Sequence, residues 1–128
     1  MTYRELSGEI IGAAIEVHRE LGPGLLESIY EHCLAKELTA RGLHFLRQHP
    51  IPVRYKGEKL DLCFKLDLWV EQQIIVEIKA VDIFQEVHRA QLLSYLRLTD
   101  CRLGLLINFN EVVVKDGVHR VVNGLNEP

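Results

Sequence analysis

FKLDLWVEQQIIVEIKAV, residues 64–81, decides the fold that the rest of the chain builds around. Residues 74–78 form the apolar run of a buried strand, yet this run contains Glu77 and is followed by Lys79. Alternate residues of a strand point to the same face, so Glu77 and Lys79 share one face and their apolar neighbours share the other. Burying two charges in a strand is costly unless they are paired, solvated in a cleft or bound to a metal.

The pairing of this strand with the one before it decides whether a site can form. The residues before Val70 alternate between apolar and polar, the period of a half-buried strand. A three-residue loop would pair Val70 with Ile74 and place Asp67 directly opposite Glu77. A two-residue loop would put the two carboxylates on opposite faces. We expect the three-residue loop, because it gathers Asp67, Glu77 and Lys79 into one acidic pocket with a lysine beside it.

Such a pocket has a chemical use. Two carboxylates about 5 Å apart across a strand pair repel each other, and a divalent cation relieves the repulsion. Magnesium usually takes one or two carboxylates together with waters and phosphate oxygens. Water held by a metal is a better nucleophile, and a nearby lysine stabilises an anionic transition state. On spacing alone, a surface hairpin with solvated charges remains the other interpretation.

Composition indicates one soluble globular domain over residues 1–128. The hydrophobic fraction is 48% and the charged fraction 26%, both ordinary values. No apolar run approaches the roughly 18 residues of a membrane span, and the first residues show no signal-peptide pattern. The three cysteines are far apart, so we expect free thiols and a cytoplasmic protein. Because the net charge is −3, any phosphate-binding surface has to be local.

Two helices are expected before the strands. Thr2 and Glu5 have the spacing of a capping box, and the helix they begin should end at Gly22-Pro23-Gly24. A second helix follows and closes before Gly42. Its first turn contains Glu27, which is either a partner of the helix dipole or a third carboxylate of the site. Tyr30 lies one turn along on the same face.

The remaining elements complete an α/β order. Strands are expected over 45–55 at a sheet edge and over 103–107 in the sheet centre, with a helix over 83–98 between the Glu77 strand and the latter. That helix carries His88, Gln91 and Tyr95 in one polar stripe, a pattern that usually faces solvent. Strands over 112–114 and 118–122 flank Asp116-Gly117, the best hairpin signal in the chain.

These elements predict a mixed central sheet flanked by helices, in the order α-α-β-β-β-α-β plus a C-terminal hairpin. The strands on either side of the third helix should be parallel neighbours joined by a right-handed crossover. We find no internal repeat or linker, which agrees with a single domain.

The motifs resemble a known family. The spacing D-x9-E-x-K from Asp67 to Lys79 is similar to that of the PD-(D/E)XK nuclease superfamily. GPGLLESIYE at residues 22–31 resembles the signature of the GxxExxY protein family, which is classed within it. IIGAAIEVHRELG, KLDLWVE, VEIKAV, AQLLSYL and GLLINF resemble further landmarks in order, so the resemblance covers essentially the whole chain. It implies the restriction-endonuclease-like α-β-β-β-α-β core.

The resemblance also implies roles. Asp67 and Glu77 would bind Mg²⁺ or Mn²⁺, helped by the carbonyl of Ile78 and by Glu27, with Lys79 as the catalytic lysine. The positions predicted to contact substrate are Gln91, Tyr95, Tyr30 and His88, and further candidates for phosphate contacts are Arg47, His49, Arg54, Lys56, Lys59, Arg89 and Arg97.

The implied activity is hydrolysis of phosphodiester bonds, most simply in DNA. A chain this small could act as a homodimer or with a targeting partner. Two alternatives are a non-catalytic nucleic-acid-binding or regulatory module that retains the nuclease fold, and an interaction domain whose charged hairpin is incidental. Membership of a fold family names the fold more securely than the substrate.

Overall fold

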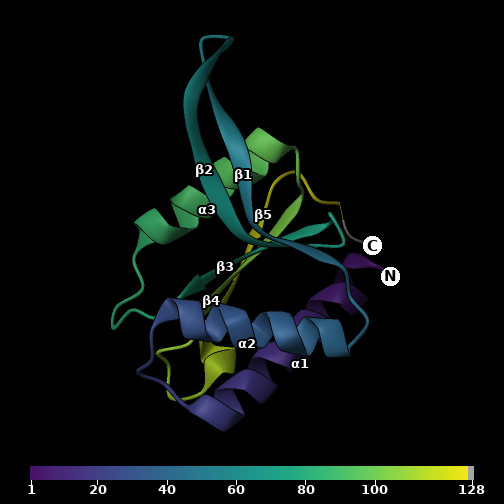
Figure 1. The fold of residues 1–128 in the computed structure, drawn as a ribbon, viewed down its shortest axis with the longest axis vertical. Helices are drawn as coiled ribbons and strands as arrows, with labels where there is room; N and C mark the ends of the chain where they lie inside the picture. The colour runs from purple at the N-terminus through teal and green to yellow at the C-terminus, as the bar shows by residue number, and fades with distance from the viewer. Residues whose placement is uncertain (127–128) are drawn as a thin grey trace.

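The computed structural model describes residues 1–126. Within this range the chain forms three helices, a five-stranded sheet and one short 3₁₀ turn (Figure 1). None of the helices in this range is long and apolar enough to cross a membrane. In chain order the elements are α1 (Tyr3–Leu21), α2 (Glu27–Ala40), β1 (Phe45–Tyr55), β2 (Glu58–Val70), β3 (Ile74–Lys79), α3 (Glu86–Thr99), β4 (Leu103–Asn108), η1 (Val114–Gly117) and β5 (Val118–Val122).

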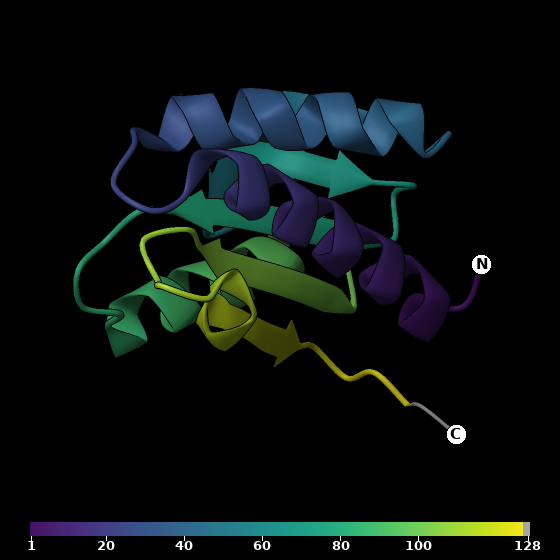
Figure 2. The same cartoon turned by 90° about the horizontal axis from the view of Figure 1, so that it is seen from below.

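The sheet is mixed, as the sequence predicts. Its strand order is β1-β2-β3-β4-β5, so β1 is an edge strand. Strands β3 and β4 are parallel and are connected through α3, and every other neighbouring pair is antiparallel. Helices α1 and α2 cover one face of the sheet and α3 covers the other (Figures 1 and 2). This arrangement confirms the predicted α/β, restriction-endonuclease-like fold class.

The alternation of β3 sorts its side chains between two apolar clusters. Val76 and Ile78 pack with α1 and α2, and Ile75 packs with α3. Strand β4 is buried along its whole length, as expected for a strand covered on both faces. Glu77 is therefore a carboxylate in the middle of the molecule.

The first helix begins where the sequence predicts. The Thr2 side chain accepts a hydrogen bond of 3.1 Å from the backbone N–H of Glu5, and the helix ends at Gly22, where φ is 68°. Helix α3 begins three residues later than expected, because Gln85 and His88 form a capping box before Glu86. Ile83 is left outside the helix and is exposed.

The prediction of a C-terminal hairpin around Asp116-Gly117 is wrong, because only the second of its two strands forms. Residues 112–114 are not a strand, and β5 pairs with β4, starting from Ile107 opposite Val118. Neither Asp116 nor Gly117 has the positive φ that a two-residue hairpin turn requires. A Cβ on Gly117 would lie 2.4 Å from the carbonyl oxygen of Asn108. Glycine is therefore required here because the backbone of η1 passes close to the end of β4.

Strands β1 and β2 continue past the sheet as a two-stranded arm (Figure 1). Its turn is formed by Lys56, with φ 51°, and Gly57, with φ 80°. These consecutive positive values match the left-handed turn that joins tightly paired strands. The residues from Arg54 to Lys59 are all exposed.

Candidate active site

The register of β2 and β3 is the predicted one. Val70 pairs with Ile74 and Leu68 pairs with Val76, and in the same register the next positions are Asp67 and Glu77. The backbone-to-backbone pairing of β2 and β3 ends at Leu68 and Val76, and the next hydrogen bonds between the two strands are made by the carboxylates. The N–H of Asp67 donates to Oε2 of Glu77 at 2.8 Å, and the N–H of Ile78 donates to Oδ2 of Asp67 at 2.8 Å. The two acids are thus fixed between strands that separate at this point.

Strand β2 also changes face at Asp67. Leu66 belongs to the apolar cluster under α3, while Leu68 belongs to the cluster under α1 and α2. Residues i and i+2 of a regular strand point to the same face, so the strand twists sharply between them. Asp67 is placed at this twist, where its side chain reaches β3.

The environment resists charge on both carboxylates. Glu77 is 5% exposed. Burial, followed by the negative charge of Asp67, raises the pKa of Glu77 to about 8. Burial also raises the pKa of Asp67, against the effect of the N–H of Ile78. A buried acid and a half-buried one, both harder to ionise than in water, form a site that positive charge would stabilise.

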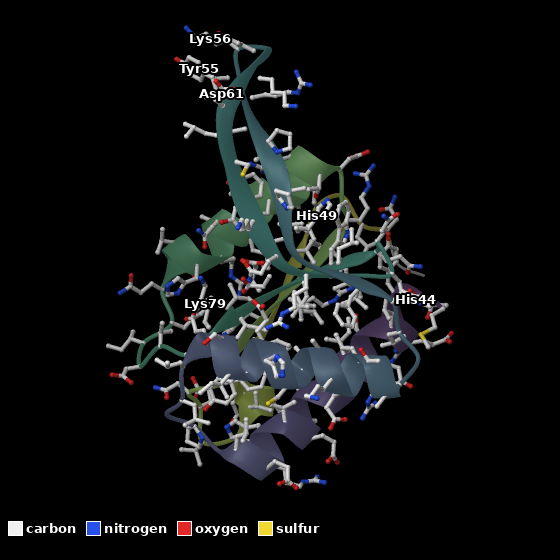
Figure 3. All side chains as sticks on the ribbon, in the orientation of Figure 1. His44, His49, Tyr55, Lys56, Asp61 and Lys79 are labelled. Atoms are coloured by element: carbon white, nitrogen blue, oxygen red, sulfur yellow. The ribbon has the colours of Figure 1, made fainter. Side chains whose placement is uncertain are left out.

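Lys79 supplies part of that positive charge. It lies at the end of β3 on the face of Glu77, and in the view of Figure 3 it lies between the first turns of α2 and α3. Its charge acts to lower the pKa of both carboxylates, although less strongly than burial raises each of them. Asp67, Glu77 and Lys79 therefore lie together, as the sequence predicts.

Glu27 lies at the edge of this group. Its Oε2 accepts a hydrogen bond of 3.1 Å from the N–H of Ala80, directly after Lys79. Within residues 1–126, no three His, Cys, Asp or Glu side chains converge closely enough to form a metal site by themselves. The structure brings Asp67 and Glu77 together and leaves Glu27 against the backbone that carries Lys79.

Three further residues complete the surroundings of Asp67, and the sequence analysis missed their roles. The Nε2 group of Gln48 donates to Oε1 of Glu31 at 2.6 Å and to Oδ1 of Asp67 at 3.2 Å. Nε of Arg47 donates to Oε2 of Glu31 at 2.7 Å. Glu31, 7% exposed, adds a negative charge that further raises the pKa of Asp67 and Glu77.

A sequence signal existed for one of these residues only. Glu31 follows Glu27 by four positions and so lies on the same face of α2. Gln48 has a φ of 50°, in the left-handed region that residues other than glycine rarely adopt. Nothing in an alternating strand pattern indicates such a residue, so the contact with Asp67 could be found only in the structure.

The three residues of the polar stripe on α3 differ in role: Tyr95 and Gln91 lie on the side of the acids, whereas His88 caps the helix. Burial and the charges of Glu77 and Asp67 raise the pKa of Tyr95, so its hydroxyl lies within electrostatic reach of both acids. Gln91, one turn earlier on the same face, is exposed. His88 instead accepts a hydrogen bond of 3.2 Å at Nδ1 from the N–H of Gln85 and caps the helix.

Tyr30, expected at the substrate, lies in the core. Its side chain is fully buried and its ring stacks on Phe109, with centroids 4.6 Å apart. Its hydroxyl donates to the carbonyl of Gly22 at 2.5 Å and accepts from the N–H of Leu25 at 3.1 Å. Tyr30 therefore fixes the loop that leads into α2 and does not line the site.

We expect Tyr30→Phe to lower the free energy of unfolding by about 1–2 kcal/mol, because two loop groups lose a buried hydrogen-bond partner. Urea unfolding measures the change. Tyr55→Phe is the matched control, because Tyr55 is 61% exposed and removal of its hydroxyl should change stability little. Equal stability of the two variants would contradict the role given to the Tyr30 hydroxyl.

The candidate phosphate contacts do not form one cluster. Arg47 is engaged by Glu31, and Arg89 donates to the carbonyl of Arg120. Arg54, Lys56 and Lys59 lie on the arm, whose tip Figure 3 marks with Tyr55, Lys56 and Asp61.

The fold and the paired acids indicate a nuclease-like domain, and comparison with protein families agrees. Residues 4–121 match the model of a family described as the PD-(D/E)XK nuclease superfamily, so the chain belongs to this superfamily. Its members are generally nucleases and typically use divalent metals. No curated protein and no solved structure matches the chain significantly. The match does not reach the finer GxxExxY family, which stays a prediction.

Proposed function

We propose that this protein is a divalent-metal-dependent nuclease that hydrolyses phosphodiester bonds in DNA, with Asp67, Glu77 and Lys79 as its catalytic residues. The observation that carries the proposal is a buried acid, Glu77, beside a half-buried one, Asp67, with a lysine next to them. Glu77 accepts a hydrogen bond of 2.8 Å from the N–H of Asp67, Asp67 accepts one of 2.8 Å from the N–H of Ile78, and the pKa of both carboxyls is raised. A fold would not keep such a pair for stability, since burying like charges is costly.

The donor set fits Mg²⁺ or Mn²⁺. Hard divalent cations take carboxylate and carbonyl oxygens, and Mg²⁺ characteristically uses one or two carboxylates and keeps several waters. Within the described residues, no hydrogen bond engages Oε1 of Glu77. Asp67 and Glu77 would hold the ion, with the carbonyl of Ile78 as a further ligand and Glu27 acting through a water. A bound cation of this kind activates a water and neutralises charge on the phosphoryl group.

The role we assign to Lys79 is electrostatic. Its ammonium group would donate hydrogen bonds to the attacking water and to the phosphoryl oxygens, whose negative charge grows in the transition state. An ammonium group stabilises an anion and has no free lone pair with which to remove a proton from water.

The face of α3 that carries Gln91 and Tyr95 would position the scissile strand. The Tyr95 ring stacks on Phe64 of β2 with centroids 4.3 Å apart, so its hydroxyl is fixed beside the carboxylates. Groups held in this way lose little entropy when the substrate binds.

A non-catalytic nucleic-acid-binding or regulatory module that retains the nuclease fold is the second candidate. It is favoured by the finding that no three His, Cys, Asp or Glu side chains within residues 1–126 converge into a metal site. Labelled single-stranded and duplex DNA incubated with Mg²⁺ or Mn²⁺ distinguishes the two. We expect cleavage that requires the metal and that falls on the order of 10²- to 10³-fold in Lys79→Ala. Binding without cleavage would support the module, and cleavage that persists unchanged in Lys79→Ala would refute the proposed site.

A further inference from the structure

The outer part of the β1–β2 arm has no structural role that accounts for its length. Ile51 and Phe64, paired across the arm, are the last of its residues that pack on the α3 cluster. From Pro52 to Tyr55 the strand continues for four residues, roughly 13 Å at the usual rise per residue. In Figure 1 this part stands clear of the helices and of the other strands.

The arm concentrates positive charge in an acidic chain. Residues 50–65 contain four of the 15 Lys and Arg residues and two of the 18 Asp and Glu residues. Arg54 and Lys59 are directly paired across the two strands, and both are exposed. Like charges directly opposite each other destabilise a strand pair. An anion bound at this pair would remove the repulsion.

The tip adds an aromatic ring to these charges. Tyr55 is 61% exposed, and Nζ of Lys56 lies 5.4 Å from the centre of its ring. An exposed ring among cations, on a part of the arm beyond its contacts with the α3 cluster, is characteristic of a surface that contacts nucleic acid.

We propose that the arm binds duplex DNA, with Arg54 and Lys59 against its phosphates, and that it holds the duplex for cleavage at the site. The proposal rests on the proposed nuclease function and narrows its substrate to double strands. The major groove of B-form DNA, about 12 Å wide, admits a two-stranded β-ribbon, whereas the major groove of duplex RNA is deep and narrow. The base of the arm is fixed to the site through the stack of Phe64 on Tyr95.

The variant Lys59→Glu separates binding from stability. An acid at this position faces Arg54 as an opposite charge, so the arm should be at least as stable as in the wild type. The matched control is Lys115→Glu, which makes the same change of charge at an exposed position of η1, away from the arm. Fluorescence anisotropy with a labelled duplex and with one of its strands, in EDTA so that no cleavage occurs, measures the affinities of the full chain.

We expect Lys59→Glu to weaken duplex binding about tenfold or more, with an unchanged or higher melting temperature, while Lys115→Glu binds like the wild type. In Lys59→Ala, the slope of log affinity against log salt should become shallower by about 1. Equal affinity of wild type and Lys59→Glu, equal losses in the control, or no duplex binding by the wild type would overturn the proposal.

Two further results are decisive. A dimer that Lys59→Glu dissociates, with duplex binding unchanged, would overturn the proposal in favour of contact between two copies of the chain. Because binding is measured without metal, it is tested independently of the nuclease function. A wild type that binds the duplex through the arm but never cleaves it would refute the nuclease function and leave the proposal for the arm intact.

Discussion

Glu77→Gln is expected to lower the rate of metal-dependent cleavage on the order of 10³-fold while the protein stays folded. The loss follows from removing one of two carboxylates that would hold the cation. The fold should persist because the glutamine oxygen can still accept the hydrogen bond from the N–H of Asp67, which Oε2 of Glu77 accepts at 2.8 Å.

Glu77→Gln should disturb the hydrogen bonds of the site less than Asp67→Asn would. The two oxygens of Asp67 accept from Gln48 and from the N–H of Ile78, so an asparagine amide would oppose one of these donors. Glu20→Gln, at an exposed position of α1, controls for the loss of one carboxylate elsewhere. Single-turnover cleavage compares the three proteins. A Glu77→Gln rate within a few fold of the control would remove Glu77 from the mechanism.

The second large effect concerns stability and pH in the metal-free protein. The pKa of Glu77 is about 8 in the folded chain, against 4.5 as its ordinary value. The folded state therefore binds this proton more tightly than the unfolded state. The stability that the folded state gains from binding this proton is fully present below pH 4.5 and is lost as the pH rises toward 8.

We expect the wild type in EDTA to lose on the order of a few kcal/mol between about pH 5 and pH 8.5, and Glu77→Gln to lose much less. Urea unfolding at several pH values gives both curves, and the difference between them isolates Glu77 from other titrating groups. Mg²⁺ should restore stability at high pH in the wild type only, because a ligand that binds the folded state stabilises it. Parallel curves for the two proteins would mean that Glu77 titrates normally.

The alternation around residues 64–81 was sufficient to predict the centre of the molecule. Register depends on loop length and on which residues are apolar, and both can be read from the sequence here. That information placed Val70 against Ile74 and brought Asp67 next to Glu77. The order of elements gave the mixed sheet in the same way, because a helix between two buried strands favours a parallel pair.

Contacts between distant parts of the chain were beyond the reach of these patterns. Tyr30 has the spacing of a site residue, but its stacking on Phe109 depends on how α2 meets the end of β4. Gln48 contacts Asp67 through a backbone angle that no periodicity indicates. Asp116-Gly117 has the composition of a hairpin turn, yet packing against Asn108 decides its conformation. In each case tertiary contact overrides the local preference.

The central claim is that Asp67 and Glu77 are built to share a divalent cation, and anomalous diffraction from crystals soaked in Mn²⁺ tests it most directly. We expect an anomalous peak in contact with both carboxylates, and no such peak in crystals of Glu77→Gln. A peak at other residues, or no peak beside these acids in the wild type, would contradict the claim.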